Sequence, residues 1–182
     1  MMSSHAPFAE RSQFTRGCIA AAVAAFLLLA LPSCGRGKVR TRASIEALAA
    51  DPARDAWQKP TDLLDKAEIS VGARVVDLGA GNGYLLTHLS ERVGPTGAVV
   101  AIEFEADLVA QLKGHIVASK LGNVGAYLEA EGVLPGSDNF DRVILLDSYG
   151  ALAEPVGTLE RIRTRLVVGG LLVIVGHKPD ES

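Results

Sequence analysis

Cysteine is nearly absent from this sequence of 182 residues, and histidine is sparse. The two cysteines, Cys18 and Cys34, both lie near the N-terminus. The rest of the chain therefore has neither a disulfide nor a metal site built from thiolates. The histidines stand singly, and their spacing gives no ligand cluster: they are His5, His88, His115 and His177.

Positive charge and aromatic side chains are also scarce. The formal net charge is −3, only 5% of residues are aromatic, and no basic run is interleaved with aromatic residues. We therefore expect no nucleic-acid partner. Because 48% of the residues are hydrophobic, the chain should be globular, and its length suits one domain with a core of its own.

One long hydrophobic run lies near the N-terminus. Arg11 and Arg16 precede an apolar stretch from Ile19 to Leu31, which is typical of a signal peptide and short for a membrane-spanning helix. The stretch leads into Leu31-Pro32-Ser33-Cys34-Gly35, which resembles the lipobox of bacterial lipoproteins. The resemblance implies that Cys34 is acylated and becomes the new N-terminus. An uncleaved anchor and an ordinary signal peptide are the alternatives, and all three predict export to the periplasmic side of the inner membrane.

The expected domain organisation follows from this run. We assign residues 1–34 to a lipoprotein signal peptide and lipobox, 35–60 to a tether and lead-in segment, and 61–182 to the folded domain. The lead-in holds Trp57, the only tryptophan. Trp57 either packs this segment onto the domain, which is the favoured interpretation, or acts as a lid over a ligand.

The stretch from Val75 to Tyr84 organises the domain. Val75 and Val76 are β-branched, as a buried parallel strand requires. Three alternating glycines then predict a tight turn that can approach a ligand closely. Apolar residues at helical spacing follow: Leu85, Leu86, Leu89 and Val93. A strand, a glycine loop and a helix in this order place a cofactor over the helix N-terminus.

The segment Asp77-Leu78-Gly79-Ala80-Gly81-Asn82-Gly83 resembles the S-adenosylmethionine-binding motif of class I methyltransferases. A dinucleotide fold would have the spacing G-x-G-x-x-G, so a nicotinamide-dependent oxidoreductase is a weaker alternative. A glycine turn in an unrelated α/β protein is another. The resemblance implies S-adenosyl-L-methionine as the cofactor. It assigns the following residues to the cofactor site: Asp77, Gly79, Ala80, Gly81, Gly83 and Tyr84.

Further site residues follow from strand ends. Glu103 lies 20 residues after Gly83 and ends the second expected strand, as an acid that binds a ribose diol should. In the family the residue after this acid, here Phe104, lies near the adenine. The family's acid for the adenine amino group falls on Ala130, so a neighbour, Glu129 or Glu131, is the expected substitute.

Strands and helices alternate along the rest of the domain. Strands are expected over 74–77, 98–103, 124–128 and 140–147, and helices over 44–50, 61–67, 84–93, 106–120 and 155–165, with Thr61 as the cap of the second helix. Residues 167–175 resemble the family's Gly-Gly turn followed by its fifth strand. This pattern predicts a Rossmann-like, doubly wound, mostly parallel sheet of about five strands. Asp147 ends the fourth strand and should face the ligand crevice, where it could contact the methionine amine or the acceptor.

The resemblance covers residues 61–178 and lacks the family's last two strands. The apolar segment from Leu171 to Val175 would then form an open edge, and we expect self-association or a partner there.

The best interpretation is an S-adenosylmethionine-dependent methyltransferase with an unknown acceptor and no metal. No general base is evident after the fourth strand, where Gly150 and Ala151 occupy places that hold histidines in related secreted sequences. The alternative is a non-catalytic lipoprotein module that binds the cofactor or a nucleotide and has lost catalysis.

The lipobox makes a direct prediction about processing. In the expressed full chain, radiolabelled fatty acid should be incorporated into the parent protein and should be absent from Cys34→Ser. The matched control, Cys18→Ser, should keep the label, because Cys18 lies within the segment expected to be removed. An unlabelled, unprocessed parent protein would contradict the prediction.

Overall fold

The computed structural model describes residue 47, residues 51–129 and residues 139–176. Cys34, Ala130, Glu131 and nearly all of the helix expected over 44–50 lie outside the described residues. Within the described part, no helix combines the length and the hydropathy needed to cross a bilayer.

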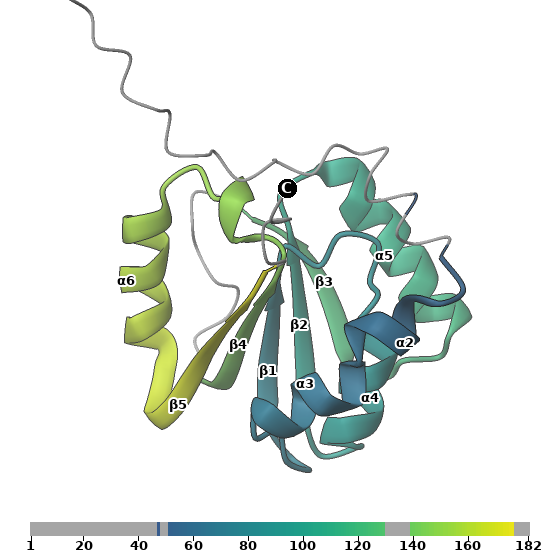
Figure 1. The fold of residues 1–182 in the computed structure, drawn as a ribbon, viewed down its shortest axis with the longest axis horizontal. Helices are drawn as coiled ribbons and strands as arrows, with labels where there is room; N and C mark the ends of the chain where they lie inside the picture. Colours follow the sequence, from purple (N-terminus) through teal and green to yellow (C-terminus); the bar gives the residue numbers. More distant parts are fainter. Residues whose placement is uncertain (1–46, 48–50, 130–138, 177–182) are drawn as a thin grey trace, which may run out of the picture. The chain divides into compact units, whose positions relative to one another are not determined.

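Five parallel strands form one sheet in the order β3-β2-β1-β4-β5 (Figure 1). The strands are β1 (Arg74–Leu78), β2 (Ala98–Glu103), β3 (Val124–Leu128), β4 (Phe140–Leu146) and β5 (Leu166–Val175). The predicted doubly wound α/β fold is confirmed. Strand order reverses between β1 and β4, and in such sheets ligands bind outside the carboxyl ends of the strands at this point.

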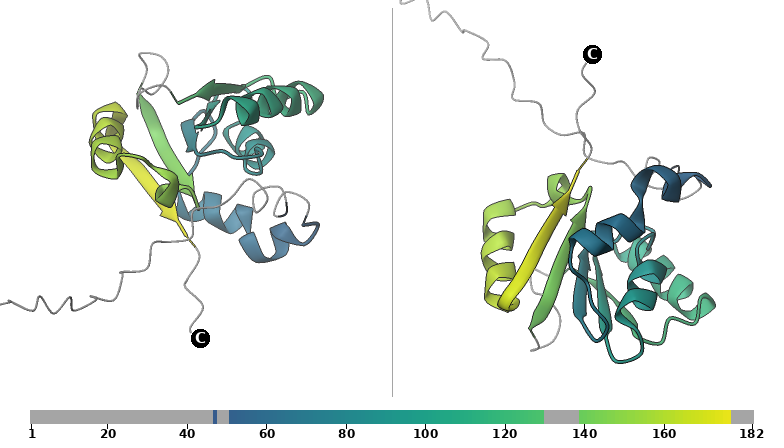
Figure 2. Two further views of the ribbon diagram at one scale, coloured as in Figure 1. Left: turned by 90° about the horizontal axis from the view of Figure 1, so that it is seen from above. Right: turned by 60° about the horizontal axis from the view of Figure 1, so that its bottom comes forward.

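Helices cover both faces of the sheet, as the views in Figure 2 show. They are α2 (Arg54–Gln58), α3 (Pro60–Lys66), α4 (Leu86–Val93), α5 (Ala106–Ala118) and α6 (Pro155–Arg165), with a 3-10 turn η1 (Tyr149–Ala151). One core cluster joins α3, α4 and α5 to the sheet, through residues such as Leu64, Leu89 and Leu112. A second cluster joins α6 to the opposite face, where Ile162 packs with Phe140.

Several element boundaries differ from the expected ones. Thr61 is not a helix cap: α3 begins at Pro60, whose fixed φ suits the first helical position, and Lys59 precedes it with φ 48°. The helix expected from Tyr84 begins at Leu86, because turns extend through the glycine loop. Asp147 lies just beyond β4 with φ 54°.

The fifth strand also differs from the expectation. Gly169 and Gly170 were expected to turn the chain before a strand, but β5 runs through both glycines. Gly169 has φ 78°, and the pairing with β4 shifts register near this end, so the irregularity is a bulge. Among the described strands β5 has one neighbour, β4, so association through its other edge stays a prediction.

Arg142 of β4 fastens α3 to the sheet. Its side chain is 14% exposed; Nε donates to the carbonyl of Ala67 at 2.6 Å, and Nη2 donates to that of Glu68 at 3.1 Å. These carbonyls follow the last turn of α3, where backbone acceptors lack helical partners. The guanidinium therefore satisfies the end of α3 from within the sheet.

Arg142→Met should lower the free energy of unfolding by roughly 1.5–3 kcal/mol, the worth of hydrogen bonds to a charged group. The matched control is Arg92→Met, which removes an exposed ion pair with Asp65 at 2.6 Å and should cost less than about 1 kcal/mol. Urea denaturation of the three proteins measures both changes. Equal losses for the two variants would show that Arg142 does not anchor α3.

Candidate functional site

The glycine loop folds back over the end of β2. The amides of Gly79 and Ala80 both donate to the carbonyl of Ile102, at 2.8 and 3.0 Å. Gly79 has φ 79°, and a Cβ there would lie 2.3 Å from Cβ of Ser148. Only glycine therefore lets the loop pass this close to the segment that follows β4.

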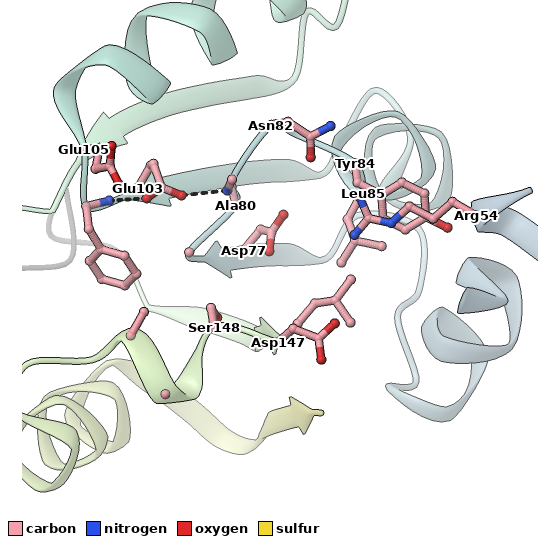
Figure 3. Close-up of a pocket in the computed structure, with 16 residues that line it drawn as sticks. Arg54, Asp77, Ala80, Asn82, Tyr84, Leu85, Glu103, Glu105, Asp147 and Ser148 are labelled. Atoms are coloured by element: carbon pink, nitrogen blue, oxygen red, sulfur yellow. Dashed lines mark hydrogen bonds between the residues drawn. The ribbon is translucent and has the colours of Figure 1, made fainter. Parts of the chain in front are cut away.

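Glu103 holds the loop from the other side. Its carboxylate accepts the Gly81 amide at 2.6 Å and the Phe104 amide at 2.7 Å (Figure 3). The residue is only 5% exposed. An ionised carboxylate has room for further donors beyond these two, because its oxygens together offer about four lone-pair sites. Glu103 can therefore brace the loop and still accept a ligand hydroxyl.

Asp77 is the most deeply buried acid of the site, with 2% exposure at the end of β1. Burial, and next the negative charge of Glu103, raise the pKa of Asp77 to about 7, although the positive charge of Arg54 acts in the opposite direction. The carboxylate is thus costly to ionise unless a cation is supplied. A ligand ammonium group would be such a cation.

A short helix outside the predicted domain contributes to the site. Arg54 of α2 is 7% exposed and lies over the ring of Tyr84, 3.6 Å from its centroid. The Tyr84 hydroxyl donates to Asp55 of the same helix at 2.8 Å, so two contacts tie α2 to the glycine loop. Burial and this hydrogen bond raise the pKa of Tyr84, so the phenol stays protonated and is no general base.

The segment after β4 forms the opposite wall. Ser148 is buried, and its hydroxyl donates to the carbonyl of Leu78 at 2.5 Å. The amide of Asp147 donates to the carbonyl of Val175 at 2.7 Å, which holds this turn against β5. In Figure 3, Asp147 and Ser148 lie across the cavity from Asp77 and Ala80.

Together these elements enclose a cavity of about 330 Å³, within the range of about 300–1,000 Å³ that small-molecule sites occupy. Of the residues expected at the cofactor site, eight line it: Asp77, Gly79, Ala80, Gly81, Tyr84, Glu103, Phe104 and Asp147. The cavity lies where β1, β2 and β4 end, as the strand order requires.

Two expected residues do not line the cavity. A Cβ at Gly83 would lie 2.9 Å from Leu112 of α5, so this glycine allows close helix packing instead. The Glu129 amide donates to the Glu103 carbonyl at 2.8 Å, which places the residue beside the site but not in its wall. Trp57 is 41% exposed, and its indole nitrogen donates to Asp51 at 2.9 Å. It does not line the cavity, so its role as a lid is not supported, and its packing onto the domain stays a prediction.

Sequence reasoning missed eight lining residues: Arg54, Asn82, Leu85, Glu105, Leu146, Ser148, Gly150 and Ala151. Seven are neighbours of expected residues or follow β4, so proximity to a motif could have found them. Arg54 lies 23 positions before Asp77, and no motif surrounds it.

The profile of the family described as "Methyltransferase domain" matches residues 69–181. The chain belongs to this family. It is 31% identical over 115 residues to a protein-L-isoaspartate O-methyltransferase of Methanothrix thermoacetophila, covering 62% of this chain and 50% of that protein. It is 29% identical over 126 residues to the ubiquinone/menaquinone biosynthesis C-methyltransferase UbiE of Hahella chejuensis, covering 68% and 50%. The chain thus spans about half the length of the curated relatives it matches.

A solved structure agrees with the fold and the family. A SAM-dependent methyltransferase from Aquifex aeolicus superposes with a TM-score of 0.71 at 26% identity, covering 79% of this chain and 78% of that one. S-adenosyl-L-methionine is accordingly the cofactor that the methyltransferase family implies for this fold.

The residues of the cavity fit that cofactor. It carries a ribose diol, which needs acceptors such as the Glu103 carboxylate, and an ammonium group, which would offset the cost of ionising Asp77. Gly79 lets the glycine loop lie close to Ser148, because any side chain at this position would push the loop away from the segment that follows β4. The described residues contain no group of three or more acids, histidines or cysteines that could hold a metal ion.

The raised pKa of Asp77 makes stability depend on pH. The folded protein binds this proton more tightly than the unfolded chain, so its contribution is complete below about pH 4 and is lost as pH rises through about 7. Asp77→Asn should therefore gain stability relative to the parent as pH rises from 4 to 8, by roughly 2–4 kcal/mol. Urea denaturation across this range measures the difference, with Asp62→Asn on the exposed side of α3 as control. A difference that does not change with pH would contradict the assignment.

Proposed function

We propose that this chain is an S-adenosyl-L-methionine-dependent methyltransferase domain whose cofactor site is the cavity at the ends of β1, β2 and β4. The observation that supports it most is the pairing of the Glu103 carboxylate with the Gly81 amide, which presets the glycine loop beside a second acid, Asp77. Glu103 would hold the ribose hydroxyls. Asp77 and the backbone of the loop would hold the methionine part.

When bound, S-adenosyl-L-methionine supplies an electrophilic methyl group. The chain's own residues act by positioning, which can supply much of the rate of such a transfer. The loop and Glu103 fix one side of the cavity, and the Ser148 hydroxyl fixes the other by its bond to β1. Asp147, which lines the cavity just beyond β4, would meet the acceptor.

A second function keeps specific support. Among the described residues that line the cavity there is no histidine, lysine or cysteine, and the Tyr84 hydroxyl is committed to Asp55. A binding module that retains the cofactor and lacks catalysis would have such a site. Methyl transfer to an acceptor that ionises readily needs no base, so the composition of the wall is compatible with both functions.

We also propose that the domain is exported and anchored by lipid on Cys34, with an unidentified methyl acceptor. The support is the sequence alone: charged residues, an apolar run and a lipobox-like ending before residue 35. Association through the edge of β5 is a further proposal. It is supported by the exposure of apolar side chains on that strand, including Leu171 and Ile174.

Glu103→Ala should weaken binding of S-adenosylhomocysteine by about 10–100-fold, because hydrogen bonds to a charged group are worth roughly 1.5–3 kcal/mol. Calorimetry of the parent and the variant measures this, and Glu91→Ala on the exposed side of α4 is the control. The affinity of Glu103→Gln, which keeps an acceptor for the loop, should lie between that of the parent and that of Glu103→Ala. An unchanged affinity would remove Glu103 from the site.

Calorimetry and a turnover assay on the parent separate the candidate functions. Binding of S-adenosylmethionine, with release of S-adenosylhomocysteine when an acceptor is added, supports the methyltransferase. Binding without release across an acceptor panel supports the binding module. Binding of NAD instead would contradict both.

A further inference from the structure

Arg54 enters the cavity from outside the segment that matches the family. The match begins at residue 69, whereas Arg54 belongs to α2, a helix of five residues that precedes it. Figure 3 shows the side chain reaching across Tyr84 toward the cavity. Arg54, which lies outside the residues that the family profile matches, therefore contributes to the wall of the site.

The position of Arg54 is well defined. Its guanidinium stacks on the Tyr84 ring, a contact in which the ring face attracts the cation. On the same helix Asp55 accepts the Tyr84 hydroxyl, and Asp55 lies 3.7 Å from Nε2 of His88 on α4. The glycine loop and α4 therefore hold α2 in place, and with it the guanidinium.

The cavity is polarised along its length. Among its described lining residues Arg54 is the only basic one, and four are acidic: Asp77, Glu103, Glu105 and Asp147. In Figure 3, Asp77 lies between Arg54 at one end and Glu103 at the other. The charge of Arg54 acts on the neighbouring carboxyl group of Asp77, and such a pair of a cation and an anion is complementary to an amino-acid group, whose carboxylate and ammonium are separated by one carbon.

We propose that Arg54 binds the carboxylate of the amino-acid end of the cofactor, beside Asp77, which receives the ammonium group. This inference rests on the proposed function. It makes Arg54 a specificity-determining residue, because it distinguishes the complete cofactor from nucleosides that lack the carboxylate. Arginine suits this role, since its planar guanidinium can donate two parallel hydrogen bonds to a carboxylate while it remains stacked on a ring.

The test compares two ligands that differ only in this group, S-adenosylmethionine and decarboxylated S-adenosylmethionine. The parent protein should prefer the complete cofactor by about 10–100-fold, the worth of a charge-assisted bond to the carboxylate. In Arg54→Met the preference should disappear, because the remaining lining acids favour the more cationic decarboxylated ligand. Arg92→Met, which removes an arginine on the surface of α4, should keep the parent's preference.

The ratio of the two affinities distinguishes this role from a structural one. If Arg54 only supports the loop, Arg54→Met lowers the affinity for both ligands by the same factor and leaves the ratio of the two affinities unchanged. This result overturns the inference. A parent protein that binds both ligands equally also overturns it, and this measurement needs no variant to fold. Arg54→Lys, which keeps the charge without the planar fork, should retain only part of the preference. If the parent binds neither ligand, the proposed function itself is wrong.

Discussion

The geometry of the site depends on the contact between one buried carboxylate and the backbone of the glycine loop. Glu103 accepts the amides of Gly81 and Phe104, so the loop after β1 and the turn after β2 are held by the same side chain. Both amides would otherwise lie at a crevice with no partner from the sheet. Because the bracing groups all belong to the chain, the position of the loop does not depend on contacts with a ligand.

The same carboxylate makes its neighbour expensive to ionise. Burial, and next the negative charge of Glu103, raise the pKa of Asp77, and Arg54 offsets them only in part. Two acids close together in a buried site destabilise the folded protein unless a cation joins them. A ligand that brings a positive charge would offset this cost, and acids with a raised pKa in a cleft are common at functional sites.

The parallel sheet and the glycine loop could be predicted from local patterns, because β-branched runs favour buried parallel strands and alternating glycines favour a tight turn. The ends of the helices were harder to predict from the sequence. Thr61 has a side chain that suits a helix cap, but α3 begins one residue earlier, because Pro60 takes the first helical position and Lys59 becomes the cap residue. Gly83 does not line the cavity, and a glycine required by helix packing against Leu112 has the same sequence pattern as a glycine required by a ligand.

Arg54 shows why the rest of the site could not be predicted. In the lead-in segment, Trp57 was the residue expected to pack onto the domain or to cover the site. Trp57 is half-exposed, whereas Arg54, three positions earlier, is buried and lines the cavity. The sequence does not tell which of the two residues of α2 faces the cavity, because the placement of α2 depends on the contacts of Asp55 with Tyr84 and His88, far along the chain. Contacts between segments distant in sequence therefore decide which residue lines the cavity. The methyltransferase family profile begins after α2, so the residues that it matches build the sheet and the glycine loop, whereas Arg54 of the cavity wall lies before them.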